Sequence, residues 1–186
     1  MEHKGTVRLE TPRLILRQFV LSDLEPMYYN CWQHEAVTKW TSYASMKTLS
    51  DVQNNADMFT EKWLSYDNPK RYSWAIVDKQ SGQVIGRMFG MDPDDSIRQV
   101  DLAYELGPDW WNCGLMTEAV QAVLHYFLKD VGFNRVFAYH ATENPASGRV
   151  MQKCGMVYEG TLRQAGKCNY GIFDVVCYSM LASELE

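Results

Sequence analysis

The sequence lacks long runs of one charge. Its 18 basic and 23 acidic residues give a formal net charge of −5, and the longest basic cluster is Lys70 with Arg71. Proteins that bind nucleic acid usually carry a basic stripe, because contacts to phosphates supply much of their affinity. We therefore expect no nucleic-acid partner.

The cysteines lack the spacing of a metal site or a disulfide framework. They are odd in number, lie far apart and include no Cys-x-x-Cys pair; they are Cys31, Cys113, Cys154, Cys168 and Cys177. Structural zinc sites usually draw on such closely spaced pairs. We expect no metal and reduced thiols, as in a cytoplasmic protein.

Long apolar runs are also missing. No stretch approaches the ~18 apolar residues of a membrane-spanning helix, and residues 1–6 lack the apolar core of a signal peptide. We expect a cytoplasmic protein with no membrane partner. Its 186 residues, 46% of them apolar, suit one domain with its own core over residues 1–186.

Alternating apolar residues predict strands in the first half of the chain. We expect a first strand over residues 6–19 and a short helix that opens on a capping box at Ser22 and Glu25. A second helix is expected from Thr48 or Ser50 to Trp63. Three strands, near 72–76, 84–91 and 100–106, then form an antiparallel meander.

The second half alternates helices and strands. Residues 116–131 have helical periodicity and end at Gly132, in the position of a helix C-cap. A strand over 135–141, a helix that Asn144 can cap, and two last strands near 156–163 and 170–181 follow. This order predicts an α+β fold with a mixed sheet, mostly antiparallel, and a parallel pair where the long helix crosses over.

Two helix starts are candidate binding sites. The turn before the long helix contains Gly114, and a helix N-terminus favours a phosphate. At the second start, Asn144 and Ser147 are three residues apart and can face the same side. Taken separately, the turn is better explained as a structural turn and the second helix start as ordinary capping, so neither feature alone establishes a binding site.

Aromatic residues gather in one part of the first half. They are Tyr28, Tyr29, Trp32, Trp40, Tyr43, Phe59 and Trp63. Such a cluster could wall a substrate pocket, although core packing is favoured. Near the C-terminus, Tyr170, Phe173 and Tyr178 could pair across a two-fold axis in a homodimer or fill the core.

Four sequence blocks together carry a resemblance to a known family. They are LETPRLILR (9–17), WWNCGLMTEA (110–119), GFNRV (132–136) and NPASGRVMQKCGM (144–156), with Glu159 and Gly160 after them. In order and spacing they resemble the GNAT superfamily of N-acetyltransferases. Within it, the chain looks like the branch of ribosomal-protein N-terminal acetyltransferases.

The resemblance implies a fold, a co-substrate and an acceptor. The fold would be GNAT-like, with helices on both faces of the sheet and a V-shaped opening between two central strands. Acetyl-coenzyme A would lie in that opening, and the acceptor would be a primary amine on a peptide N-terminus or a small molecule. The residues implied at the coenzyme are Tyr104, Leu106, Asn112, Cys113, Gly114, Leu115, Met116, Thr117, Asn144 and Lys153.

The chain departs from the family pattern at three places. The usual basic residue of the coenzyme loop is Cys113 here, and its second small residue is Met116. The tyrosine that many members carry seven residues after the asparagine is Met151, which excludes a tyrosine general acid at that place. A coenzyme-A-binding regulatory module without turnover is therefore the alternative to an enzyme.

The resemblance also implies direct transfer to a neutral amine. Ser147 would supply or relay a proton to the departing thiolate, whose free pKa is roughly 8.5. Glu105, His140 and Glu159 are the candidate bases, and an ordinary structural role is open for each. A covalent route through Cys113 is disfavoured, because nothing beside it in sequence looks like an activating base.

Overall fold

The computed structural model describes residues 1–41, 46–54 and 66–185 and contains one eight-stranded sheet, in the order β1-β2-β3-β4-β5-β6-β8-β7. The strands are β1 (Leu9–Glu10), β2 (Leu14–Arg17), β3 (Tyr72–Asp78), β4 (Val84–Asp94), β5 (Gln99–Leu106), β6 (Arg135–Ala141), β7 (Val157–Cys168) and β8 (Gly171–Leu181). The helical segments are η1 (Leu21–Asp23), α1 (Leu24–Met27), η2 (Tyr28–Trp32), α2 (Glu35–Thr38), α3 (Leu49–Asn54), η3 (Pro108–Trp110), α5 (Leu115–His125), η4 (Tyr126–Val131) and α6 (Pro145–Lys153).

Helices cover both faces of the sheet, as predicted. Strand β3 is buried along its whole length, and its side chains alternate between two apolar clusters. Trp74 and Ile76 pack toward α5 and η4, whereas Ala75 and Val77 pack toward α1, η2 and α3. None of the helices in the three described stretches is both long and apolar enough to cross a bilayer.

Two predictions for the first 32 residues are wrong in detail. The expected single strand over residues 6–19 is a hairpin of β1 and β2, in which Leu9 lies opposite Leu16. The chain reverses at Pro12, which has no N–H for a ladder. The expected capping box at Ser22 is also absent from the described chain: the helical segment begins at Leu21, and Asp23 accepts the Val20 N–H (2.9 Å).

The other predicted elements are confirmed within a few residues. The meander is β3, β4 and β5, and the long helix is α5 with η4, which ends at Gly132 with a φ of 88°. The second predicted helix begins as α3, and the rest of it, with Phe59 and Trp63, lies outside the described residues, as does Tyr43. Tyr28 and Trp32 are buried core residues, as favoured from the sequence.

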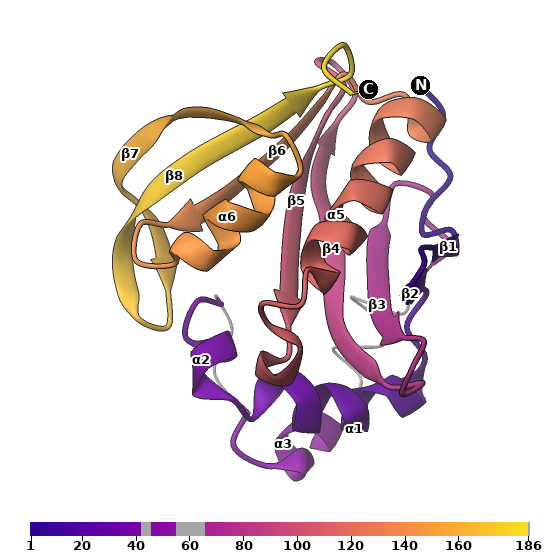
Figure 1. The fold of residues 1–186 in the computed structure, drawn as a ribbon, viewed down its shortest axis with the longest axis vertical. Coiled ribbons are helices and arrows are strands. Elements are labelled where there is room, and N and C mark those ends of the chain that lie inside the picture. Colours follow the sequence, from indigo (N-terminus) through magenta and orange to yellow (C-terminus); the bar gives the residue numbers. More distant parts are fainter. Residues whose placement is uncertain (42–45, 55–65, 186) are drawn as a thin grey trace.

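The only parallel pair in the described sheet is β5 with β6, and it is short. The two strands pair at Gln99–Arg135, Val100–Val136 and Asp101–Phe137. Beyond these pairs β5 continues to Leu106 and β6 to Ala141, and Figure 1 shows the strands diverging below the point where they meet. This is the V-shaped opening between two central strands that the family resemblance implied.

A charged cluster joins β6, β7 and β8 at the far edge of the sheet. Arg135 donates to both oxygens of the Glu159 carboxylate, which also accepts a hydrogen bond from Ser179 (2.7 Å). The Arg135 guanidinium lowers the pKa of Glu159 to about 2. Glu159 is not among the described residues that line the cavity between β5 and β6, which is described below. A carboxyl with such a low pKa is also a poor base at neutral pH.

Replacing Glu159 by Gln should destabilise the protein in a pH-dependent way. The carboxylate is 36% exposed, so we expect a loss of only about 1 kcal/mol at pH 7. Because folding lowers its pKa from 4.5 to about 2, its stabilisation is complete above about pH 4.5 and falls away toward pH 2. The measurement is urea unfolding of both proteins at pH 7, 5 and 3.5.

The wild type and Glu159→Gln should therefore converge as the pH falls. Glu2→Gln, at an exposed carboxylate, is the matched control. A stability difference that stays constant from pH 7 to pH 3.5 would show that the Arg135–Glu159 pair does not stabilise the fold through its charge.

Candidate active site

A cavity of about 670 Å³ occupies the opening between β5 and β6. Its walls come from the second half of β5, the turn before α5, the end of β6 and the first turns of α6. Residues 39–41, which follow α2, complete the wall on the side away from α5. The V-shaped divergence of the two strands is what creates this space.

The cavity brings together twelve of the fourteen residues predicted for the site; Cys113 and Glu159 are the two that do not line it. They are Tyr104, Glu105, Leu106, Asn112, Gly114, Leu115, Met116, Thr117, His140, Asn144, Ser147 and Lys153. Cys113 is not part of the described lining; its side chain is exposed and its thiol donates to the Trp111 carbonyl (3.3 Å). The roles of all these residues stay predictions.

The turn before α5 has the backbone geometry of an anion site. Gly114 occupies the N-cap position with a φ of 76° and a ψ of 4°, a left-handed conformation that favours glycine. The first N–H groups of an eleven-residue helix such as α5, those of Leu115, Met116 and Thr117, have no carbonyl partner within the helix. These residues line the cavity, so a phosphate there would meet both N–H donors and the positive end of the helix.

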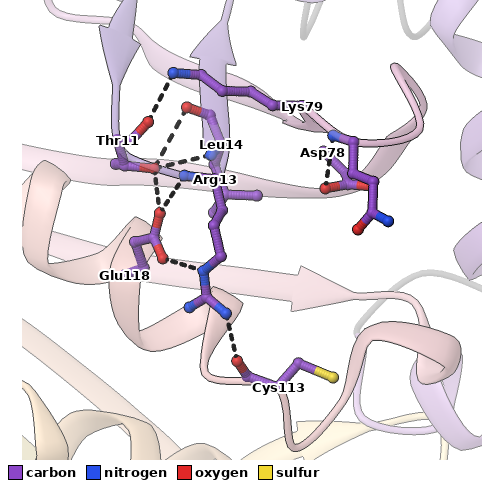
Figure 2. Close-up of polar contacts among 8 residues, drawn as sticks. Thr11, Arg13, Leu14, Asp78, Lys79, Cys113 and Glu118 are labelled. Carbon is purple, nitrogen blue, oxygen red and sulfur yellow. Dashed lines mark hydrogen bonds and ion pairs between the residues drawn. The ribbon is translucent and has the colours of Figure 1, made fainter.

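An arginine from the start of the chain supports this turn (Figure 2). Arg13 donates through one guanidinium nitrogen to the Cys113 carbonyl (2.9 Å) and through Nε to Glu118 on α5 (2.7 Å). The other Glu118 oxygen accepts the Thr11 hydroxyl and the Arg13 N–H (2.9 Å). The β1–β2 hairpin is thereby fastened to the first turn of α5.

The electrostatics of Glu118 show how strong this attachment is. Burial by itself would raise the pKa of Glu118, but the hydrogen bonds from Thr11 and Arg13 outweigh burial and keep the pKa below its usual range. The carboxylate is therefore ionised at neutral pH. Sequence analysis missed Arg13 as a site residue, and its only signal was the block of residues 9–17, which lies about a hundred residues from the turn.

Tyr104 and Ser147 join the two sides of the opening. The Tyr104 hydroxyl donates to the Ser147 carbonyl (2.9 Å), and the Ser147 hydroxyl donates to the Tyr104 oxygen (3.0 Å). Burial raises the pKa of Tyr104, so the phenol stays protonated at neutral pH. From the sequence, only the backbone of Tyr104 was expected in the site; its side chain brings a phenol from β5, while Met151 of α6 is buried in the core.

The two candidate bases that line the cavity have different surroundings. Glu105 points to the opposite face of β5 from Tyr104, forms an ion pair with Arg87 (2.6 Å) and accepts the Trp32 indole N–H (2.7 Å). His140 is 9% exposed, with Nδ1 2.7 Å from the Ala141 carbonyl. Its Nε2 faces Gly148 of α6, where an added Cβ would lie 2.4 Å away.

These contacts give Glu105 and His140 a structural role within the site. The Glu105 charge is compensated by Arg87, and the His140 ring fills the space between β6 and α6. A base acting through water needs only to lie within reach. The assignment of either residue as the base therefore stays a prediction.

The first turn of α6 adds polar groups at the end of β6. Asn144 occupies the N-cap position, as predicted, and its N–H donates to the Ala141 carbonyl (2.8 Å). In the described structure its side chain makes no capping hydrogen bond, so the ordinary capping role is not what it performs here. Lys153 at the end of α6 and Arg149 supply positive charge to the same cavity.

Comparisons with known proteins agree with this geometry. The chain is 28% identical over 173 residues to the uncharacterized N-acetyltransferase YoaA of Bacillus subtilis, covering 93% of this chain and 96% of that protein. It is 23% identical to the [ribosomal protein uS5]-alanine N-acetyltransferase of Escherichia coli, covering 83% and 80% of the two chains.

A solved structure shares the fold. The Microcin C7 self immunity acetyltransferase MccE, in complex with acetyl-CoA and AMP, superposes with a TM-score of 0.79 at 21% identity, covering 92% of this chain and 93% of that one. Residues 13–157 match the family model described as the acetyltransferase (GNAT) domain. The chain therefore belongs to the GNAT family of acetyltransferase enzymes.

Proposed function

We propose that residues 1–186 form a single-domain N-acetyltransferase that moves the acetyl group of acetyl-coenzyme A directly onto a primary amine. The observation that carries this proposal is the opening between β5 and β6, with the start of α5 at one end and Tyr104 and Ser147 across it. The presence of acetyl-CoA in the MccE complex supports the same donor here.

The lining residues suit the parts of that donor. Backbone groups of Tyr104 and Leu106 would pair with the pantetheine arm as an added strand does, whereas those of Glu105 between them face β4. The N–H groups of residues 112–117 would hold the pyrophosphate, with Lys153 near the phosphates and Asn144 bonded to the arm. The loop has no basic residue of its own at Cys113, and Arg13 fixes its carbonyl from outside.

The reaction requires a neutral amine, because an ammonium has no lone pair. Its nitrogen attacks the thioester carbonyl, a C–N bond forms, and the C–S bond breaks. The Gly107 N–H donates to Ile85 on β4, so strand alternation directs the Leu106 N–H toward the cavity. There it can stabilise the developing oxyanion, an effect worth about 3 kcal/mol.

The leaving thiolate needs a proton or a strong hydrogen bond. Ser147 donates a hydrogen bond to the thiolate once its hydroxyl turns from the Tyr104 oxygen, to which it donates in this structure, and Tyr104 keeps its own proton. The proton that the attacking nitrogen loses is taken up by a base, for which Glu105 and His140 are the candidates. Kinship with the ribosomal-protein branch, a cytoplasmic location and a homodimer remain predictions; Tyr178, one of the aromatics considered for that dimer, is buried in the core.

Replacing Ser147 by Ala should lower kcat about 100-fold, because the departing thiolate loses its hydrogen-bond donor. Tyr104→Phe should lower kcat about 10-fold, since the phenol acts through Ser147, and the double variant should match Ser147→Ala. The measurement is free-thiol release under saturating acetyl-coenzyme A, with coenzyme affinity determined separately. Tyr158→Phe, at an exposed tyrosine on β7, is the control.

Two outcomes would contradict these roles. Fully additive losses would show that Tyr104 and Ser147 act independently, and unchanged turnover in Ser147→Ala would remove the serine from the mechanism. Saturable coenzyme binding with no thiol release from any amine, in the wild type, would instead favour the regulatory module over the enzyme.

Replacing Arg13 by Gln should weaken coenzyme binding about 10-fold, because the turn before α5 loses a charge-assisted hydrogen bond that holds its carbonyl away from the phosphate. The change should appear in the Kd and KM for acetyl-coenzyme A, with kcat at saturation nearly unchanged. Isothermal titration with coenzyme A gives the Kd directly.

Arg8→Gln is the matched control for Arg13→Gln. Arg8 is also on the N-terminal segment and pairs with an exposed carboxylate, that of Glu10 (2.7 Å), but it does not reach the turn before α5. An Arg13→Gln protein that binds coenzyme A as tightly as Arg8→Gln would show that the hairpin is not needed to shape the anion site.

A further inference from the structure

Two distant segments of the chain meet on the side of the cavity away from α5. The turn between β7 and β8 donates two backbone hydrogen bonds to residues that follow α2: Asn169 to the Thr41 carbonyl (3.0 Å) and Tyr170 to the Lys39 carbonyl (3.2 Å). The Asn169 side chain adds a bond to the Thr38 carbonyl (3.0 Å). We call residues 38–41 with 169 and 170 the bridge.

Side chains reinforce the bridge. The rings of Trp40 and Tyr170 lie 5.7 Å apart, and the Lys39 ammonium lies 4.8 Å from the centre of the Trp40 ring and 5.9 Å from that of Tyr170. A cation near the face of an aromatic ring contributes about 0.5–1 kcal/mol at an exposed site. The bridge is thus fixed by backbone bonds, an amide bond and ring contacts together.

The bridge is a wall of the cavity itself. Lys39, Trp40 and Thr41 line the cavity, and Lys39 also lines a second hollow on the other side of the bridge, with Asn169 and Tyr170. The bridge therefore separates the space beside Glu105 from the space beyond α2. An acceptor that extended from the reaction centre in this direction would meet backbone atoms.

The volume of the cavity and the side chains on the bridge side also favour a compact acceptor. About 670 Å³ must hold the pantetheine arm as well as the acceptor, and cavities for single drug-sized ligands span about 300–1,000 Å³. The wall on this side carries large apolar side chains: Trp40, Met91, Tyr139 and Phe173. A peptide N-terminus needs a groove along which its following residues can continue, whereas a compact amine needs only the enclosure.

We propose that the acceptor is a small-molecule amine with an apolar or aromatic body, and that the bridge excludes protein N-termini. This inference rests on the proposed acetyltransferase function and narrows its acceptor. The Trp40 and Phe173 side chains hold the apolar body, and the amine nitrogen faces the thioester between Tyr104 and Leu106. The bridge limits how far the acceptor can extend from the thioester.

The test compares three classes of acceptor with the full-length protein and acetyl-coenzyme A. The small amines are tryptamine and phenethylamine, the polycation is spermidine, and the peptides are octamers with free N-terminal Ala, Ser or Met. Free-thiol release gives kcat/KM, and mass gain identifies the product. We expect kcat/KM for an aromatic amine to exceed that for every octamer at least 100-fold.

A bridge variant separates the wall from the rest of the site. Asn169→Ala with Tyr170→Ala removes the Thr38 bond and the Trp40 contact, and it should raise the ratio of octamer to tryptamine kcat/KM at least 10-fold. Ile172→Ala, at an exposed position on the same hairpin, should leave the ratio unchanged. Thermal unfolding with and without coenzyme A checks that each variant folds and binds the donor.

The outcomes distinguish the inference about the acceptor from the proposed acetyltransferase function. Octamers or spermidine acetylated faster than the aromatic amines by the wild type would overturn the inference and leave the acetyltransferase function in place. A ratio that is the same in the bridge variant and in Ile172→Ala would show that the bridge does not select the acceptor. Coenzyme A that stabilises the protein without thiol release from any acceptor would overturn both.

Discussion

The separation of β5 from β6 is the constraint on which the rest of the structure depends. Two parallel strands that bond over three residue pairs and then diverge leave backbone N–H and C=O groups facing a gap. Such groups need partners, and a ligand with amide groups of its own can supply them as an added strand does. Helices α5 and α6 follow β5 and β6 respectively, so both helix starts lie at the wide end of the gap. The position of the turn before α5 at the cavity and the Tyr104–Ser147 contact both depend on this divergence.

The turn before α5 is contacted by a basic residue from a distant part of the chain. The turn itself has Cys113 where related loops carry a basic residue, yet its carbonyl is held by Arg13 and its helix by the same arginine through Glu118. This arrangement uses a partly buried, hydrogen-bonded carboxylate as an anchor, which leaves the helix N–H groups for a ligand. It also attaches the N-terminal hairpin, at the edge of the sheet, to the turn that we propose holds the pyrophosphate.

A phenol also lies at the end of the cavity where we propose that the acetyl group is transferred. Met151 removes the phenol that a tyrosine on α6 would provide, and Tyr104 brings one from the opposite side of the gap. The side-chain alternation of β5 places Tyr104 toward α6 and Glu105 toward Arg87 and Trp32. Neighbouring residues on one strand therefore take part in different environments, one facing Ser147 and one within a compensated ion pair.

Periodicity and turn chemistry were enough to predict the main elements of the fold from the sequence alone. They gave the order of strands and helices along the chain, the long helix that ends at Gly132, the α+β class and the two helix starts that line one cavity. These features depend on interactions between residues close in sequence, which a pattern records. The hairpin at Pro12, the contact of Arg13 with Cys113, the Tyr104 phenol and the bridge from Asn169 to Thr41 were decided by the tertiary structure. Each joins segments far apart in the chain or turns on the reversal of a strand, and no local pattern specifies which distant side chain will arrive.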